Sequence, residues 1–118
     1  MRRVKLIGSK YGLTIANLSH AGDGNLHPCI LYDSRNETEK QTVLRAGLEI
    51  AKQLLDLGGT ISGEHGIGIA KLELMPLAFS KSDFSAMAKI KASFDRDNLS
   101  NPGKVVSPSG PVSVGKPG

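Results

Sequence analysis

The sequence predicts an α+β fold: an antiparallel sheet with helices packed on one face and a polar site at the loop edge of the sheet. Two observations carry this prediction. Short strand-like runs at residues 13–18 and 26–32 lie on either side of a glycine-containing turn. Apolar residues recur at helical spacing in residues 37–57 and 82–94, as in amphipathic helices. With 118 residues, the chain is long enough for one compact domain.

The first half of the chain contains the predicted sheet. Residues 3–11 have helical spacing, and Gly12 follows as a natural left-handed stop. Residues 13–18 are short and partly β-branched, which is typical of a strand. Residues 26–32 resume a strand, and Pro28 within it has no N–H to donate, which indicates an edge strand or the start of a strand.

The predicted helices follow the sheet. Asn36 with Glu39 three residues later resembles a capping box, and a long helix is expected to run from there to Gly58. Gly47 inside this helix costs about 1 kcal/mol relative to alanine, which suggests that another element approaches closely there. Residues 69–74 can add one or two helical turns.

The last predicted helix spans residues 82–94, and the helical turns before it are expected to stop before Pro76. An apolar stripe on this helix is interpreted as core and not as a cofactor site. The stripe consists of Phe84, Met87, Ile90, Lys91 and Phe94.

The composition excludes several classes of protein. The net charge is +4, but the basic residues are spread along the chain and few aromatic residues accompany them, so nucleic-acid binding is not expected. No apolar run is long enough to span a membrane, and no secretory signal is visible. Cys29 is the single cysteine, which excludes an intrachain disulfide and indicates a cytoplasmic protein; we expect it to be a small buried strand residue.

All three histidines lie in two short segments bracketed by glycines. The segment HAGDGNLH begins with His20 and ends with His27. It is expected to connect the two predicted strands, with one histidine at each end of the connection. His65 lies in GEHGIG, at residues 63–68. A core that needed only a polar aromatic residue would not distribute its histidines this way. We therefore expect the two segments to meet and form a site.

These residue types suit a divalent metal. Two imidazoles seven positions apart can point at one ion, and Glu64 can supply a third ligand that leaves a position open for substrate. The mixed ligand set favours zinc, with iron or manganese as alternatives. His65 can then accept a proton from a hydroxyl at the metal. Asp23 could instead be a ligand, but we expect it to form the turn or to orient an imidazole.

Other interpretations of the two segments remain open at this point. His20 and His27 can belong to a hydrogen-bonded structural turn, or to a polar substrate pocket without metal. The residues do not distinguish hydrolysis from oxidation of an alcohol. A phosphate-binding loop is set aside, because residues 63–68 lack the lysine and the strand-to-helix spacing that it requires.

Three motifs in order resemble the C-terminal domain of the FAD-linked oxidases. They are HAGDGNLHP at residues 20–28, GTISGEHGIG at residues 59–68, and the pair of FD at residues 94–95 with NPGK at residues 101–104. The resemblance is collinear from about Lys5 to Val106 and is closest to the glycolate oxidase D-subunit and D-lactate dehydrogenase type. It implies the C-terminal substrate or cap domain of a two-domain flavoprotein.

The resemblance also implies an activity and roles for single residues. The activity is FAD-dependent oxidation of a D-2-hydroxy acid to the 2-oxo acid. His20, His27 and Glu64 match the family's metal ligands, and His65 matches a residue that contacts substrate and serves as the base. Asn101 matches a position near the flavin. Cys29 stands where relatives that oxidise 2-hydroxyglutarate have asparagine, which favours glycolate or lactate as the substrate.

The resemblance further implies that the chain is a fragment. Family members are several times longer, and an N-terminal domain that is absent here holds most of their FAD. Residues 1–106 are then a partial domain with a disordered tail at residues 107–118. The expected partners are a small 2-hydroxy acid, an FAD-binding domain or subunit, and a second copy through an exposed sheet or apolar face. The competing hypothesis is a stand-alone divalent-metal-binding module or an inactive fragment.

Overall fold

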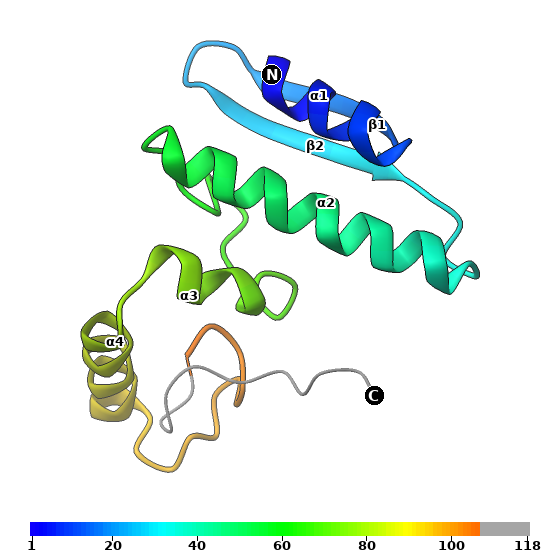
Figure 1. Cartoon of the computed structure of the whole chain (residues 1–118). Coiled ribbons are helices and arrows are strands. Elements are labelled where there is room, and N and C mark those ends of the chain that lie inside the picture. The colour runs from blue at the N-terminus through cyan, green and yellow to red at the C-terminus, as the bar shows by residue number, and fades with distance from the viewer. Residues whose placement is uncertain (107–118) are drawn as a thin grey trace. The chain divides into compact units, whose positions relative to one another are not determined.

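The computed structural model describes residues 1–106, and the tail expected at residues 107–118 lies outside them. The described residues divide into two units, the first Met1–Gly59 and the second beginning at Thr60 (Figure 1). The first unit contains α1 (Arg2–Tyr11), β1 (Thr14–His20), β2 (Asn25–Leu31) and α2 (Glu37–Asp56). The second contains η1 (Leu72–Leu74), α3 (Met75–Ala78) and α4 (Lys81–Phe94). These elements confirm the α+β class.

Helix α1 ends as the sequence predicts. Gly12 has φ 66°, in the left-handed region. The backbone N–H of Gly12 donates to the carbonyl of Ser9 at 3.3 Å, and that of Leu13 donates to Gly8 at 2.9 Å. These bonds satisfy the last carbonyls of the helix and turn the chain directly into β1. A Cβ on Gly8 would lie 3.1 Å from the Ile15 side chain, so this glycine allows α1 to pack closely on β1.

Strands β1 and β2 form a two-stranded antiparallel sheet within the described residues. Ile15 lies opposite Ile30, and both pack against a core of apolar side chains from α1 and α2. Residues on the other face are exposed, including Leu18 at 66% and Leu31 at 58%. The helices therefore cover one face of the sheet, as expected from the sequence. The core residues are Val4, Ile7, Ala46 and Ile50.

Strand β2 begins earlier than its sequence indicates. It starts at Asn25, which lies opposite His20, so the connection between the strands is only residues 21–24. His27 is therefore inside β2, opposite Leu18, and not at the end of the connection between the strands. Pro28 lies opposite Asn17 in a strand at the edge of the described sheet, which confirms the edge position.

Helix α2 has the predicted cap with one difference. The Asn36 side chain accepts a hydrogen bond from the Glu39 backbone N–H at 3.2 Å. The Glu39 carboxylate accepts from the backbone N–H of Asp33 at 3.0 Å and not from that of Asn36, so the reciprocal half of a capping box is replaced by a bond to the preceding loop. After α2, Gly58 has φ 77°.

Polar side chains connect α1 to α2. Glu49 accepts hydrogen bonds from Lys10 at 2.7 Å and from the Tyr11 hydroxyl at 2.9 Å. The bond from Lys10, followed by that from Tyr11, holds the pKa of Glu49 below its ordinary value of 4.5. Arg3 donates to Gln53 at 2.7 Å one turn further along α2. These contacts lie beside the apolar core and fix the two helices in one register.

The close approach expected at Gly47 is wrong for the described residues. A Cβ built on Gly47 meets nothing within 4 Å, because this position of α2 faces open space. Gly47 therefore makes the helix less stable than alanine would, and no close packing in this unit requires a glycine there.

The helical turn predicted within residues 69–74 is present as η1, which ends at Leu74, before Pro76. What the sequence did not predict is that α3 begins directly afterwards with Pro76 in its first turn, where a proline loses no intrahelical hydrogen bond. Helix α4 begins with a complete capping box, in which Ser80 and Asp83 each accept from the other's backbone N–H at 3.3 and 2.8 Å. No helix in residues 1–106 combines the length and apolar character needed to cross a bilayer.

The apolar stripe of α4 is only partly core, which corrects the prediction. Phe84 is 5% exposed and packs edge-on against Phe79, with 6.5 Å between ring centroids. Ile90 is 64% exposed and Phe94 is 90% exposed. The periodicity identifies an apolar face correctly, but within the described residues only the N-terminal part of that face is covered.

Two glycine substitutions should have opposite effects on stability. Gly47→Ala should raise the free energy of unfolding by about 0.5–1 kcal/mol, because alanine favours the helix and its Cβ meets open space. Gly12→Ala should lower it by about 1–2 kcal/mol, because a Cβ is strained at φ 66°. Urea unfolding monitored by circular dichroism measures both, and a destabilised Gly47→Ala would contradict the open environment.

The Glu49 contacts should make stability depend on pH. A carboxyl group whose pKa is lowered by folding stabilises the protein above its unfolded pKa and loses that contribution as pH falls through the folded pKa. The difference in melting temperature between wild type and Glu49→Gln should therefore be largest near neutral pH and shrink below about pH 4.5. Gln53→Ala removes the neighbouring contact from Arg3 but no carboxyl group, so it is the control and should show no such trend. A pH-independent Glu49→Gln difference would contradict the assignment.

Candidate functional site

The turn between the strands is built by its own backbone and by Asp23. The N–H groups of Asp23 and Gly24 donate to the carbonyl of His20 at 3.3 and 3.1 Å. The Asp23 carboxylate accepts from the backbone N–H of Asn25 at 3.1 Å, and Gly24 has φ 74°. This geometry supports the interpretation of Asp23 as a turn-forming residue. The turn returns the chain so that Asn25 lies opposite His20.

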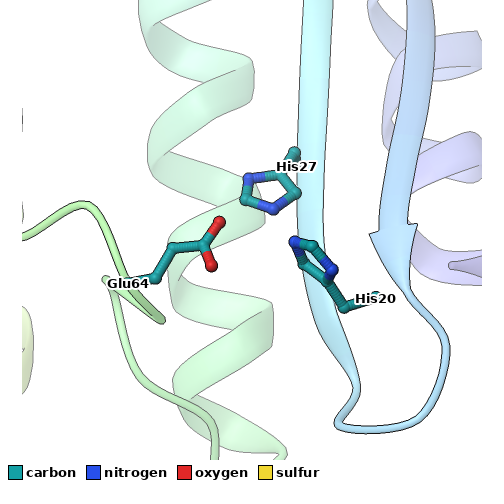
Figure 2. A group of neighbouring side chains, drawn as sticks. All are labelled: His20, His27 and Glu64. Atoms are coloured by element: carbon teal, nitrogen blue, oxygen red, sulfur yellow. The ribbon is translucent and has the colours of Figure 1, made fainter.

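The register places His20 and His27 on the same face of the sheet. Asn25 is opposite His20, and His27 is two positions after Asn25, so their side chains project to the same side. The two ring centroids are 5.3 Å apart at an interplanar angle of 77° (Figure 2). Their nearest ligand nitrogens are no more than 4.8 Å apart. Two nitrogens on one tetrahedral zinc ion lie about 3.3 Å apart, so the two imidazoles are near the spacing that one ion requires.

Cys29 shares this face of β2, two residues after His27. Its thiol is exposed, so the expectation of a buried strand residue is wrong. The strand alternation accounts for the difference, because Ile30 takes the core-facing position and turns Cys29 outward. The Cys29 sulfur lies 3.6 Å from the carbonyl oxygen of His27.

Glu64 and His65 lie together in the second unit, on the loop between Ser62 and Gly68. His65 Nε2 is 3.2 Å from a carboxylate oxygen of Glu64, and the His65 and Glu64 side chains are 70% and 44% exposed. Figure 2 labels Glu64 on this loop, together with His20 on β1 and His27 on β2. The loop turns at Gly66, with φ 75°, and at Gly68, with φ 55°. It presents an acid and an imidazole side by side to solvent.

Asn101 lies elsewhere in the second unit, in a turn after α4. It has φ 48°, and its side-chain oxygen accepts from the Lys104 ammonium at 3.1 Å. Asn101 and Lys104 line an open cavity of about 540 Å³, whose apolar lining includes Met87 and Ile90.

Asp95 organises this turn, a role that sequence reasoning did not assign. Its carboxylate accepts from the Lys91 ammonium and from the backbone N–H groups of Leu99 at 2.8 Å and Ser100 at 3.1 Å. The Lys91 bond is the main cause of an Asp95 pKa below its ordinary value. The available signal was an acid directly after a helix and four residues from a lysine.

The structure therefore brings the predicted site residues together in two groups. His20 and His27 are neighbours in the first unit, and Glu64 and His65 are neighbours in the second. Asn101 lies at the cavity in the second unit. Its turn is tied to the loop of Glu64 and His65 by the backbone N–H of Val105, which donates to the carbonyl of Gly68 at 3.2 Å.

Comparison with known proteins gives a consistent result. Residues 1–105 match the family described as FAD linked oxidases, C-terminal domain. The glycolate oxidase subunit GlcD of Bacillus subtilis is 42% identical over 105 residues, which are 89% of this chain and 22% of the relative. The same subunit of Escherichia coli K12 is 42% identical over 98 residues, which are 83% of this chain and 20% of the relative. A D-lactate dehydrogenase of Archaeoglobus fulgidus is 40% identical over 105 residues, 89% of this chain and 23% of the relative.

The chain thus spans about a fifth of the length of these relatives. The family match extends from residue 1 to Val105, so it includes both histidine-containing segments and the turn at Asn101. The resemblance that the three sequence motifs indicated is confirmed by this match. The chain belongs to the FAD-linked oxidases, and residues 1–105 represent their C-terminal domain.

Proposed function

We propose that this chain supplies the metal and substrate site of an FAD-dependent oxidoreductase that converts a D-2-hydroxy acid of the glycolate or D-lactate type to the 2-oxo acid. The observation that carries the proposal is the His20–His27 pair, held on one face of a β-hairpin with its rings 5.3 Å apart. The proposed reaction is supported by the family, whose members include proteins named glycolate oxidase and D-lactate dehydrogenase.

In this proposal His20, His27 and Glu64 bind one divalent ion, with zinc as the first candidate. The donor set fits, because two imidazole nitrogens and a carboxylate oxygen are ligands that zinc, iron and manganese accept. Three protein ligands leave positions for the hydroxyl and carboxylate oxygens of a 2-hydroxy acid. The ion, when bound, supplies a Lewis acid for these oxygens.

His65 serves as the base. It is adjacent to Glu64 and 70% exposed, so a substrate at Glu64 is within reach of its ring. The imidazole accepts the proton of the substrate hydroxyl, and the carbon that carries this hydroxyl loses a hydride as the carbonyl forms. FAD, when bound, would supply the acceptor for that hydride. Asn101, which lines the cavity in the second unit, would lie near the flavin.

The FAD itself is held mainly by a separate flavin-binding domain or subunit. Residues 1–105 match the family's C-terminal domain, and by themselves they should bind little FAD and show no turnover. The exposed sheet face with Leu18 and Leu31 is the surface through which we expect self-association when this partner is missing.

Metal binding tests the proposed ligands. Titration of the purified chain with Co²⁺, a zinc substitute with visible absorption, should saturate at one ion. The double variant His20→Ala/His27→Ala should weaken binding by at least about 100-fold, more than loss of an outer hydrogen-bond partner costs. Glu64→Gln should weaken it by about 10-fold or more, because it removes an anionic ligand. Glu73→Gln removes an exposed carboxylate elsewhere in the second unit, so it is the matched control and should bind normally. Wild-type affinity in Glu64→Gln would contradict the ligand set.

Reconstitution tests the reaction. The purified chain should be colourless and inactive, and mixing with a separately expressed flavin-binding domain from a glycolate oxidase relative should restore dye reduction that depends on glycolate or D-lactate. His65→Ala should abolish this activity even at saturating metal, because it removes the base. A yellow purified chain with a flavin absorbance band would contradict the assignment of FAD binding to a separate domain. A metal-loaded mixture that stays inert would favour the alternative of a stand-alone metal-binding module.

A further inference from the structure

The loop that carries Glu64 and His65 is closed at its base by a side chain. The Ser62 hydroxyl donates to the carbonyl of Gly66 at 2.8 Å. This bond joins the two ends of the five-residue segment 62–66, with Glu64 at its centre. The carboxylate and the neighbouring imidazole therefore lie on a closed loop and not on an open strand.

Lys71 fixes the same hydroxyl from the other side. Its ammonium donates to the Ser62 oxygen at 3.3 Å, so the hydroxyl is an acceptor as well as a donor. The backbone of Lys71 is itself held, because its N–H donates to the carbonyl of Ile67 at 3.3 Å. The lysine and the serine are both half-buried, in contrast to the exposed residues 63–66 that they support. Together, Ser62 and Lys71 form what we call the loop brace.

The loop needs such a brace because of its glycines. Gly63 and Gly66 flank Glu64 and His65, and Gly66 adopts φ 75°. Glycine has more conformational freedom to lose than any other residue, so a loop bracketed by glycines loses much entropy when one conformation is required. A metal ligand that is already held in place loses less entropy when the ion binds, and it therefore binds more tightly.

We infer that Ser62 and Lys71 are positioning residues that hold Glu64 ready to bind the divalent ion. This inference rests on the proposed function and deepens it, because it assigns the affinity of the carboxylate partly to two residues that do not touch the metal. The ammonium orients the hydroxyl, the hydroxyl closes the loop, and the closed loop presents Glu64.

Co²⁺ binding to the full chain tests the loop brace. Ser62→Ala should weaken binding about five-fold, the effect of one net hydrogen bond. Ser62→Thr keeps the hydroxyl and should restore binding to within about two-fold of wild type. Lys71→Met should weaken binding in the same direction, and Lys71→Arg should restore part of the loss. Ser85→Ala, an exposed serine on α4, is the control and should leave the affinity unchanged.

A double-mutant cycle shows whether the brace acts through Glu64. In a Glu64→Gln background, the further change Ser62→Ala should have no effect on Co²⁺ affinity, because the ligand that it positions is gone. An equal loss in both backgrounds would overturn the inference, and so would wild-type affinity in Ser62→Ala. Normal Co²⁺ binding by Glu64→Gln itself would instead refute the three-ligand site. Failure of the loop brace and failure of the proposed metal site are therefore distinguishable. Melting temperatures of all variants identify any that are unfolded.

Discussion

The antiparallel register of β1 and β2 is the constraint on which the first unit depends. Side chains alternate along a strand, so a slip of one residue would move His27 to the face that packs on the helices and Ile30 to solvent. The four-residue turn with its Asp23 and Gly24 contacts prevents that slip. One set of backbone hydrogen bonds thus buries the core and also pairs the two histidines.

The second unit positions its functional groups in another way. Glu64, His65 and Asn101 lie on loops, where no ladder of backbone hydrogen bonds fixes them. Side chains fix these loops instead, since Ser62 closes one loop and Asp95 accepts from backbone N–H groups of the other. These loops expose their functional side chains, so a ligand can reach them. The hydrogen bonds at the ends of each loop give those side chains a defined geometry.

The sequence predicted those features that depend on neighbouring residues. The stop at Gly12 and the cap at Asn36 are local, and so is the pairing of His20 with His27, which needs only a short turn between two strands. Features that depend on what packs nearby were missed. Periodicity alone could not show that Phe94 is exposed, that Gly47 faces open space, or that Ser62 reaches Gly66 across its loop.

The proline in β2 has a consequence for association between chains. Pro28 lies at the middle of the strand, opposite Asn17, and proline is tolerated in a sheet where its missing N–H would face away from the partner strand. A strand that approached the outer edge of β2 would therefore meet a row of hydrogen-bonding groups with one donor missing at its centre. Strand β1 contains no proline, so its outer edge has no such interruption. A hairpin with an exposed apolar face is an aggregation hazard, and Pro28 disfavours growth of the sheet from the β2 side.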